Sequence, residues 1–190
     1  MLVLRPAVVG DVRGQQVLRG GLNGIGDIAE QKRVAEVEAD AGAPAVELIE
    51  RSVAVKVEVV SRDLRESGPR EILNYGHTLG HAVERLEDYR IPHGHAVGIG
   101  MVFAAALGKV AGTIDGEALM RHKVLLSAIG LPTTYRADAL PELIELMRID
   151  KKSRGATLRF VVLDGIGKAV MLEDPDPAML EAAYREVAQR

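Results

Sequence analysis

An amphipathic pattern begins after Pro44. Val46, Ile49, Val53 and Val57 recur at spacings of three and four, which places them on one face of an α-helix. The stretch VAVKVEVV over 53–60 also alternates with period two and is rich in β-branched valine, which favours a strand. Because the whole apolar pattern covers about 17 residues, longer than a typical strand, we expect a helix here.

Breakers and periodic segments divide the rest of the chain. Ser67-Gly68-Pro69 precedes a helix predicted over 70–86, because proline is favoured at the first helical position. Segment 96–111 is apolar nearly all round, which predicts a central buried helix. Two β-like runs flank Asp164-Gly165-Ile166-Gly167, which predicts a hairpin. The remaining expected elements are a loop over 88–94, helices over 115–129, 141–148 and 176–189, and the hairpin strands 157–163 and 168–172.

These elements predict a mainly α fold, a helical bundle with one small β-hairpin. The segment 1–42 holds seven of the twenty glycines and no lasting period. We therefore interpret 1–42 as a divergent or weakly structured N-terminal segment and 43–190 as the helical domain.

Composition narrows the function classes. The chain has 190 residues, of which 47% are hydrophobic and 3% aromatic, so we expect an aliphatic core. Its net charge of -3 argues against nucleic-acid binding, which needs a basic face. The absence of cysteine excludes disulfides, thiolate metal sites and cysteine nucleophiles. No apolar run reaches the length of a membrane span and the N-terminus lacks a signal-peptide pattern, so we expect a cytoplasmic protein without membrane contact.

Four of the five histidines lie within 19 residues, at His77, His81, His93 and His95. His77 and His81 are four apart, so both imidazoles would leave the same helix face. A return through the following loop would bring His93 and His95 to the same point. Imidazole is the commonest protein ligand for Zn²⁺, so one interpretation of the cluster is a metal site. The alternative is that each histidine only makes local hydrogen bonds. His122, on a charged helix face, is expected to make only a local hydrogen bond.

Cationic side chains accompany the histidines. On one continuous helix, Arg70, Asn74, His77 and His81 would form a polar stripe lining a cleft. Arginine offers a fork suited to carboxylate or phosphate. Lys56, Lys151 and Lys152 add positive charge, which together with a metal would suit an anionic substrate.

Several motifs resemble one known family in order and spacing. They are SVAVKVEVVSRD (52–63), EILNYGHTLGHAVE (71–84), AVGIGMVFAAAL (96–107), LSAIGLPTTY (126–135) and IDKKSRGATLRFVVLDGIGKAV (149–170). Together they resemble the C-terminal domain of 3-dehydroquinate synthase over about 46–190. The resemblance implies a lyase of the shikimate pathway and of aromatic amino acid biosynthesis. It would convert 3-deoxy-arabino-heptulosonate 7-phosphate to 3-dehydroquinate with loss of phosphate, using NAD⁺ and Zn²⁺ or Co²⁺.

The resemblance also implies residue roles. His77 and His93 match metal ligands, and Lys56 and Arg70 match groups that hold the substrate carboxylate. Asn74, His81 and Lys152 match groups around the substrate phosphate, with Lys151 an adjacent candidate. Lys56, Arg70, Asn74 and His81 are the candidate catalytic residues. The family's third metal ligand, a glutamate upstream of the first histidine, has no clear counterpart here.

The family's N-terminal NAD-binding domain has no counterpart in 1–42, so we expect a truncated form that is inactive alone. Two alternatives stay open. The first is another sugar-phosphate cyclase, or more distantly a glycerol-dehydrogenase-like enzyme; Arg70 and Lys56 argue for a carboxylated substrate instead. The second is a non-catalytic, metal-binding helical remnant. The resemblance also allows for a homodimer.

Overall fold

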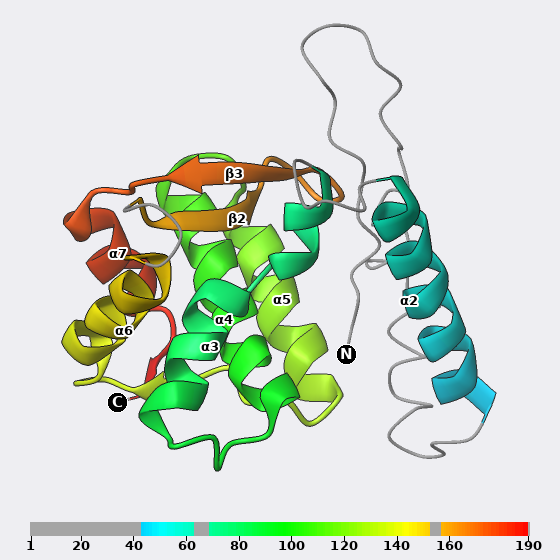
Figure 1. Cartoon of the computed structure of the whole chain (residues 1–190), viewed down its shortest axis with the longest axis horizontal. Coiled ribbons are helices and arrows are strands. Elements are labelled where there is room, and N and C mark those ends of the chain that lie inside the picture. The colour runs from blue at the N-terminus through cyan, green and yellow to red at the C-terminus, as the bar shows by residue number, and fades with distance from the viewer. Residues whose placement is uncertain (1–42, 63–68, 153–156, 190) are drawn as a thin grey trace, which may run out of the picture.

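A computed structural model describes residues 43–62, 69–152 and 157–189. The predicted N-terminal segment 1–42 lies outside the described residues. Within the described ranges the fold is mainly helical with short strands, which confirms the predicted class (Figure 1). The helices are α2 (Ala43–Arg62), the 3-10 helix η1 (Pro69–Asn74), α3 (His77–Leu86), α4 (His93–Val110), α5 (Gly116–Ala128), α6 (Leu140–Lys152) and α7 (Pro177–Tyr184). The strands are β1 (Tyr135–Arg136), β2 (Arg159–Leu163), β3 (Ala169–Glu173) and β4 (Ala188–Gln189). No helix in these ranges is long and apolar enough to cross a membrane.

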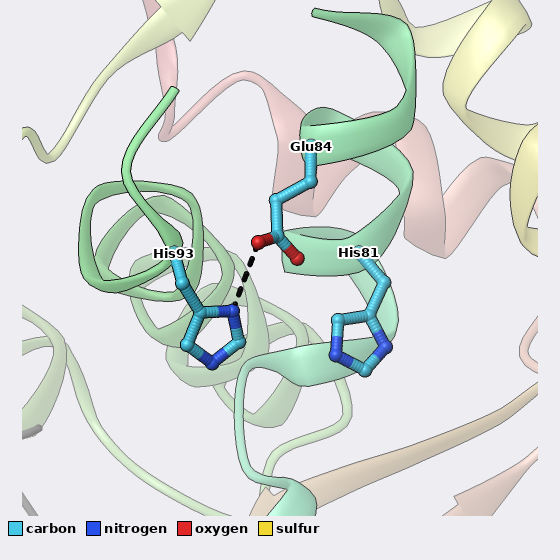
Figure 2. A group of neighbouring side chains, drawn as sticks. All are labelled: His81, Glu84 and His93. Atoms are coloured by element: carbon cyan, nitrogen blue, oxygen red, sulfur yellow. Dashed lines mark hydrogen bonds and ion pairs between the residues drawn. The ribbon is translucent and has the colours of Figure 1, made fainter. Parts of the chain in front are cut away.

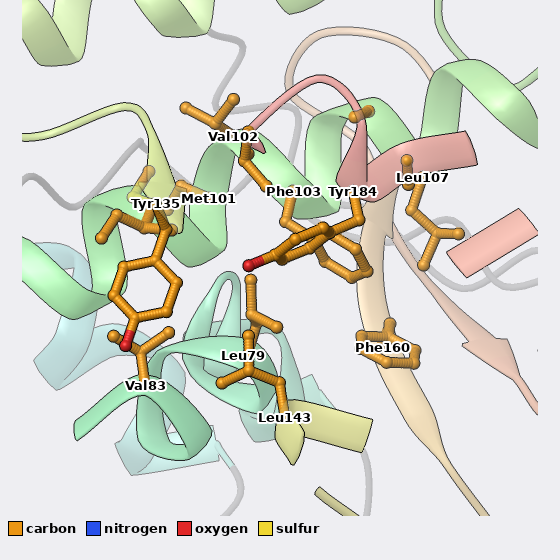
Figure 3. Packing of buried hydrophobic residues seen from close by; sticks show 14 of the residues in the cluster. Leu79, Val83, Met101, Val102, Phe103, Leu107, Tyr135, Leu143, Phe160 and Tyr184 are labelled. Atoms are coloured by element: carbon orange, nitrogen blue, oxygen red, sulfur yellow. The ribbon is translucent and has the colours of Figure 1, made fainter. Parts of the chain in front are cut away.

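Helix α4 is the centre of the bundle, as its all-round apolar pattern predicts. Its residues from 98 to 108 are buried without interruption, and it packs against α3, α5, α7 and β2. The core is largely aliphatic, but both phenylalanines lie inside it (Figure 3). The Phe103 ring lies 5.8 Å from that of Phe160 and 6.4 Å from that of Tyr184, which ties α4 to β2 and α7.

The predicted helix over 70–86 is wrong at its centre. The chain forms a short 3-10 helix, turns at Tyr75-Gly76 and restarts as α3 at His77. Gly76 has φ +79°, which a residue with a Cβ rarely adopts. A Cβ there would also lie 2.7 Å from the Met101 backbone nitrogen of α4. The turn is therefore set by the close approach of α4, a partner that local periodicity does not reveal.

The α2 helix forms as predicted, but the stripe that predicts it is not buried. Val46, Ile49, Val53 and Val57 are 53% to 62% exposed, whereas Val59 is buried. Figure 1 shows α2 beside the bundle rather than within it. The helical period is thus real, yet the described residues bury another face of this helix.

The remaining elements match the predictions with shifted bounds. The hairpin of β2 and β3 is confirmed, with Phe160 opposite Leu172. Helix α5 is confirmed, and the Asp115 carboxylate caps it by accepting from the backbone N–H of Ala118. Helix α6 runs four residues past the predicted end, whereas α7 stops at Tyr184. The residues after α7 instead form β4, which pairs in parallel with β1. Strands of two residues carry no periodic signal, so this pair was not predicted.

Candidate functional site

Three of the four clustered histidines, carried by α3 and α4, have their rings close together. His77 is the first residue of α3, His81 lies one turn later, and His93 is the first residue of α4. The ring centroids of His77 lie 5.3 Å from those of both His81 and His93, and the His81 and His93 centroids are 6.0 Å apart. This confirms that the loop return brings His93 to the helix face of His77 and His81. In the described residues, neither His77 nor His95 belongs to the group of His and carboxylate ligand atoms that lie within 4.8 Å of one another.

A backbone carbonyl orients the His77 ring. His77 Nδ1 lies 3.1 Å from the Tyr75 carbonyl oxygen, which can only accept, so Nδ1 carries the proton and donates. The lone pair of the neutral ring is then on Nε2. Burial lowers the pKa of His77, which favours this neutral form. A neutral imidazole with one nitrogen already oriented is the state in which histidine binds metals.

A carboxylate whose role the sequence pattern does not reveal lies beside His93. Glu84, on α3, places Oε1 3.0 Å from His93 Nδ1 (Figure 2). His81, Glu84 and His93 each offer a ligand atom within 4.8 Å of the others. The available signal was the three-residue spacing from His81, which places Glu84 on the same side of α3 one turn later.

His122 has a structural environment. It is 5% exposed, so its expected place on a charged helix face is wrong, but its expected local hydrogen bond is confirmed. Nδ1 lies 2.7 Å from the Ala118 carbonyl oxygen and therefore donates, which leaves Nε2 to accept from the Tyr75 hydroxyl at 3.0 Å. The side chain of Tyr75, whose carbonyl orients His77, is thereby anchored on α5.

Comparison with known protein families identifies the chain. The family described as 3-dehydroquinate synthase C-terminal matches residues 24–153. The chain belongs to this family. The match begins upstream of residue 46, where the motifs place the start of the resemblance, so part of the segment 1–42 is also family-like in sequence. The division at residue 42 stays a prediction.

Relatives named 3-dehydroquinate synthase are 54% to 60% identical. The protein from Streptomyces avermitilis is 54% identical over 171 residues, which cover 86% of this chain and 47% of the relative. The one from Nocardia farcinica is 58% identical over 149 residues (78% and 40%), and the one from Rhodococcus opacus 60% over 143 residues (75% and 39%). The chain thus spans less than half the length of these relatives.

Solved structures of sugar-phosphate cyclases share the fold. One is ValA, a 2-epi-5-epi-valiolone synthase from Streptomyces hygroscopicus with NAD⁺ and Zn²⁺ bound, with a TM-score of 0.74 and 22% identity over 83% of this chain and 44% of that one. Another is 2-deoxy-scyllo-inosose synthase with carbaglucose-6-phosphate, NAD⁺ and Co²⁺, with a TM-score of 0.63 and 25% identity over 73% and 40%. These likenesses confirm the predicted helical C-terminal architecture.

Among the described side chains, the predicted substrate-binding residues other than His81 do not gather at one point as the histidines do. Arg70 is half-buried on η1, and Asn74 is exposed at its end. Because η1 is separated from α3 by the turn at Gly76, the continuous polar stripe from Arg70 to His81 is wrong. In the described part of the chain, no hydrogen bond or ion pair joins Asn74 or the exposed Lys56 of α2 to the three histidines. Lys151 and Lys152 are the last two residues of α6, and the structure does not describe their side chains.

Proposed function

We propose that this chain is the metal- and substrate-binding part of a 3-dehydroquinate synthase. The proposed reaction converts 3-deoxy-arabino-heptulosonate 7-phosphate to 3-dehydroquinate with elimination of phosphate. The observation that carries the proposal is the convergence of His77, His81 and His93 in a chain 54% identical to a named 3-dehydroquinate synthase.

The donor set fits a divalent metal. His77 and His93 would hold Zn²⁺ or Co²⁺ through Nε2, since Nδ1 of each ring is already engaged by an acceptor. Such an ion supplies Lewis-acid polarisation of an alcohol or carbonyl oxygen. His81 is exposed beside both rings and also belongs to the metal-capable group with Glu84 and His93. We assign it to the substrate phosphate because its position in the motif matches that role in the family.

The remaining roles follow from charge and hydrogen-bonding capacity. The Arg70 guanidinium and the Lys56 ammonium would pair with the substrate carboxylate, and Asn74, Lys151 and Lys152 with its phosphate. NAD⁺, bound in the solved cyclases, would be the hydride acceptor of the complete enzyme. No residue of the described ranges is assigned to NAD⁺.

The test is phosphate release from the seven-carbon sugar phosphate with NAD⁺ and Co²⁺. It compares this chain alone with a chimera that adds the remaining N-terminal part of the Streptomyces avermitilis relative. We expect turnover by the chimera and its loss in His93→Ala. The matched control is His95→Ala, two residues along the same helix and assigned neither to the metal nor to the substrate. A chimera that folds, binds NAD⁺ and Co²⁺ and still releases no phosphate would contradict the proposal.

A second candidate is another sugar-phosphate cyclase, favoured by the likeness to 2-deoxy-scyllo-inosose synthase. Its ligand, as named, carries a phosphate and no carboxylate. Arg70 and Lys56 argue against this candidate, because they favour a carboxylated substrate. Turnover of glucose 6-phosphate by the same chimera would support it.

We also propose a homodimer and a cytoplasmic location, in keeping with a biosynthetic enzyme. The exposed apolar stripe of α2 supports association, because apolar surface gains from being covered. Sedimentation over a range of concentrations tests the first proposal, and cell fractionation tests the second.

A further inference from the structure

The Glu84 carboxylate lies between α3 and α4, the two helices that carry the clustered histidines. Its side chain is only 13% exposed, whereas that of His93 is 51% exposed. Burial of a carboxylate is costly unless hydrogen-bond donors compensate it. The donor recorded for Glu84 among the described residues is His93 Nδ1, on the first residue of α4. The contact therefore links the end of α3 to the start of α4.

This contact selects one tautomer of His93. An ionised carboxylate only accepts, so His93 Nδ1 must carry the proton and the lone pair of the neutral ring is on Nε2. The Tyr75 carbonyl imposes the same tautomer on His77. In both rings Nε2 is thus the nitrogen that can bind a metal, with Nδ1 held by an oxygen acceptor.

We propose that Glu84 is a positioning residue that orients His93 and fixes its tautomer for metal binding. The inference rests on the proposed function, which makes His93 a metal ligand, and adds the residue that prepares that ligand. The competing role is direct ligation, in which Glu84 binds the ion together with His81 and His93, whose ligand atoms lie within 4.8 Å. Glu84→Gln distinguishes the two roles, because its amide oxygen can still accept the hydrogen bond from His93 but is a poor substitute for a metal-binding carboxylate.

The first test measures the tautomer without metal. Two-bond ¹H–¹⁵N spectra of the chain at pH 8 report which nitrogen of each neutral imidazole carries the proton. We expect the Nδ1–H form for His93 in the unaltered chain and in Glu84→Gln, whose amide oxygen still accepts. We expect a shift to the Nε2–H form in Glu84→Ala. Glu181→Ala, which removes an exposed carboxylate from α7, is the matched control. An unchanged His93 tautomer in Glu84→Ala overturns the proposal.

The second test is Co²⁺ affinity, followed by the visible absorption of the bound ion. Loss of a residue that orients a metal ligand typically costs about 10- to 100-fold in affinity. We expect that loss for Glu84→Ala and a much smaller one for Glu84→Gln, with the absorption bands retained. Equal large losses for Glu84→Gln, Glu84→Ala and His81→Ala, with altered bands, would make Glu84 a ligand and overturn its positioning role. Unchanged affinity in His77→Ala and His93→Ala would instead contradict the metal assignment of the proposed function.

Discussion

A methyl group added at Gly100 should disrupt the helix pair that carries the histidines. A Cβ at Gly100 would overlap the Gly76 carbonyl oxygen and would lie 2.9 Å from the Gly76 carbonyl carbon and 3.0 Å from the Gly80 nitrogen. These atoms form the first turn of α3, in which the Gly80 N–H donates to the Gly76 oxygen at 3.0 Å. The obstruction is backbone, so no side-chain rotation relieves it.

The expected cost follows from that geometry. Overpacking a close-packed interior costs about 1–3 kcal/mol, and the upper end applies because the start of α3 itself must move. A loss of about 3 kcal/mol lowers the melting temperature by roughly 6–12 °C in a chain of this size. The same movement displaces His77 from His93, so we expect weaker Co²⁺ binding in the folded fraction as well.

The matched control is Gly94→Ala in the same helix α4. Among the described residues, no atom outside the local backbone lies within 4 Å of a Cβ at Gly94, and alanine has a higher helix propensity than glycine. Thermal and urea unfolding, followed by circular dichroism, compare the two variants with the unaltered chain. Equal stabilities of Gly100→Ala and Gly94→Ala would refute the argument that the α3–α4 approach requires glycine.

Three further predictions concern single side chains. Tyr75→Phe removes the donor to the buried His122 Nε2, so we expect a loss of about 1–3 kcal/mol in the free energy of unfolding, measured with urea. Burial lowers the pKa of His122, so its neutral form contributes stability that is present above the unfolded pKa of about 6.5 and is lost as pH falls below it. The stability difference between the unaltered chain and His122→Leu should therefore shrink between pH 7.5 and pH 5; a constant difference would contradict this. Arg70→Ala should weaken carboxylated ligands more than inorganic phosphate in calorimetry, with exposed Arg85→Ala as the control, and equal losses for both ligand classes would exclude the carboxylate role.

Elements with a strong signal in their own residues could be predicted from the sequence. Helix α4 is apolar nearly all round, α5 begins at a capping aspartate, and β2 and β3 flank a glycine turn. The break at Gly76 could not be predicted in this way, because its cause is Met101, far along the chain. The exposure of the α2 stripe could not be predicted either. A helical period shows that one face is apolar, but it does not show whether another part of the chain covers that face.

The candidate site also has parts that the sequence predicts and parts that it does not. The spacing of His77 and His81 and the short return to His93 were sufficient to predict that the three rings meet. Glu84 was missed because its meaning depends on His93, which approaches from another helix. The stripe from Arg70 failed because it assumed one continuous helix across Gly76.

The position of the histidines adds an electrostatic reason for Glu84. His77 and His93 are the first residues of α3 and α4, so both would hold a cation at the positive end of a helix dipole. Each such end disfavours a cation by about 0.3–1 kcal/mol. The Glu84 carboxylate, in the last turn of α3 and in contact with His93, supplies the opposite charge at the start of α4. Glu84→Gln keeps the hydrogen bond but loses this charge, so its Co²⁺ affinity should fall by about 2- to 5-fold, a loss that added salt should reduce.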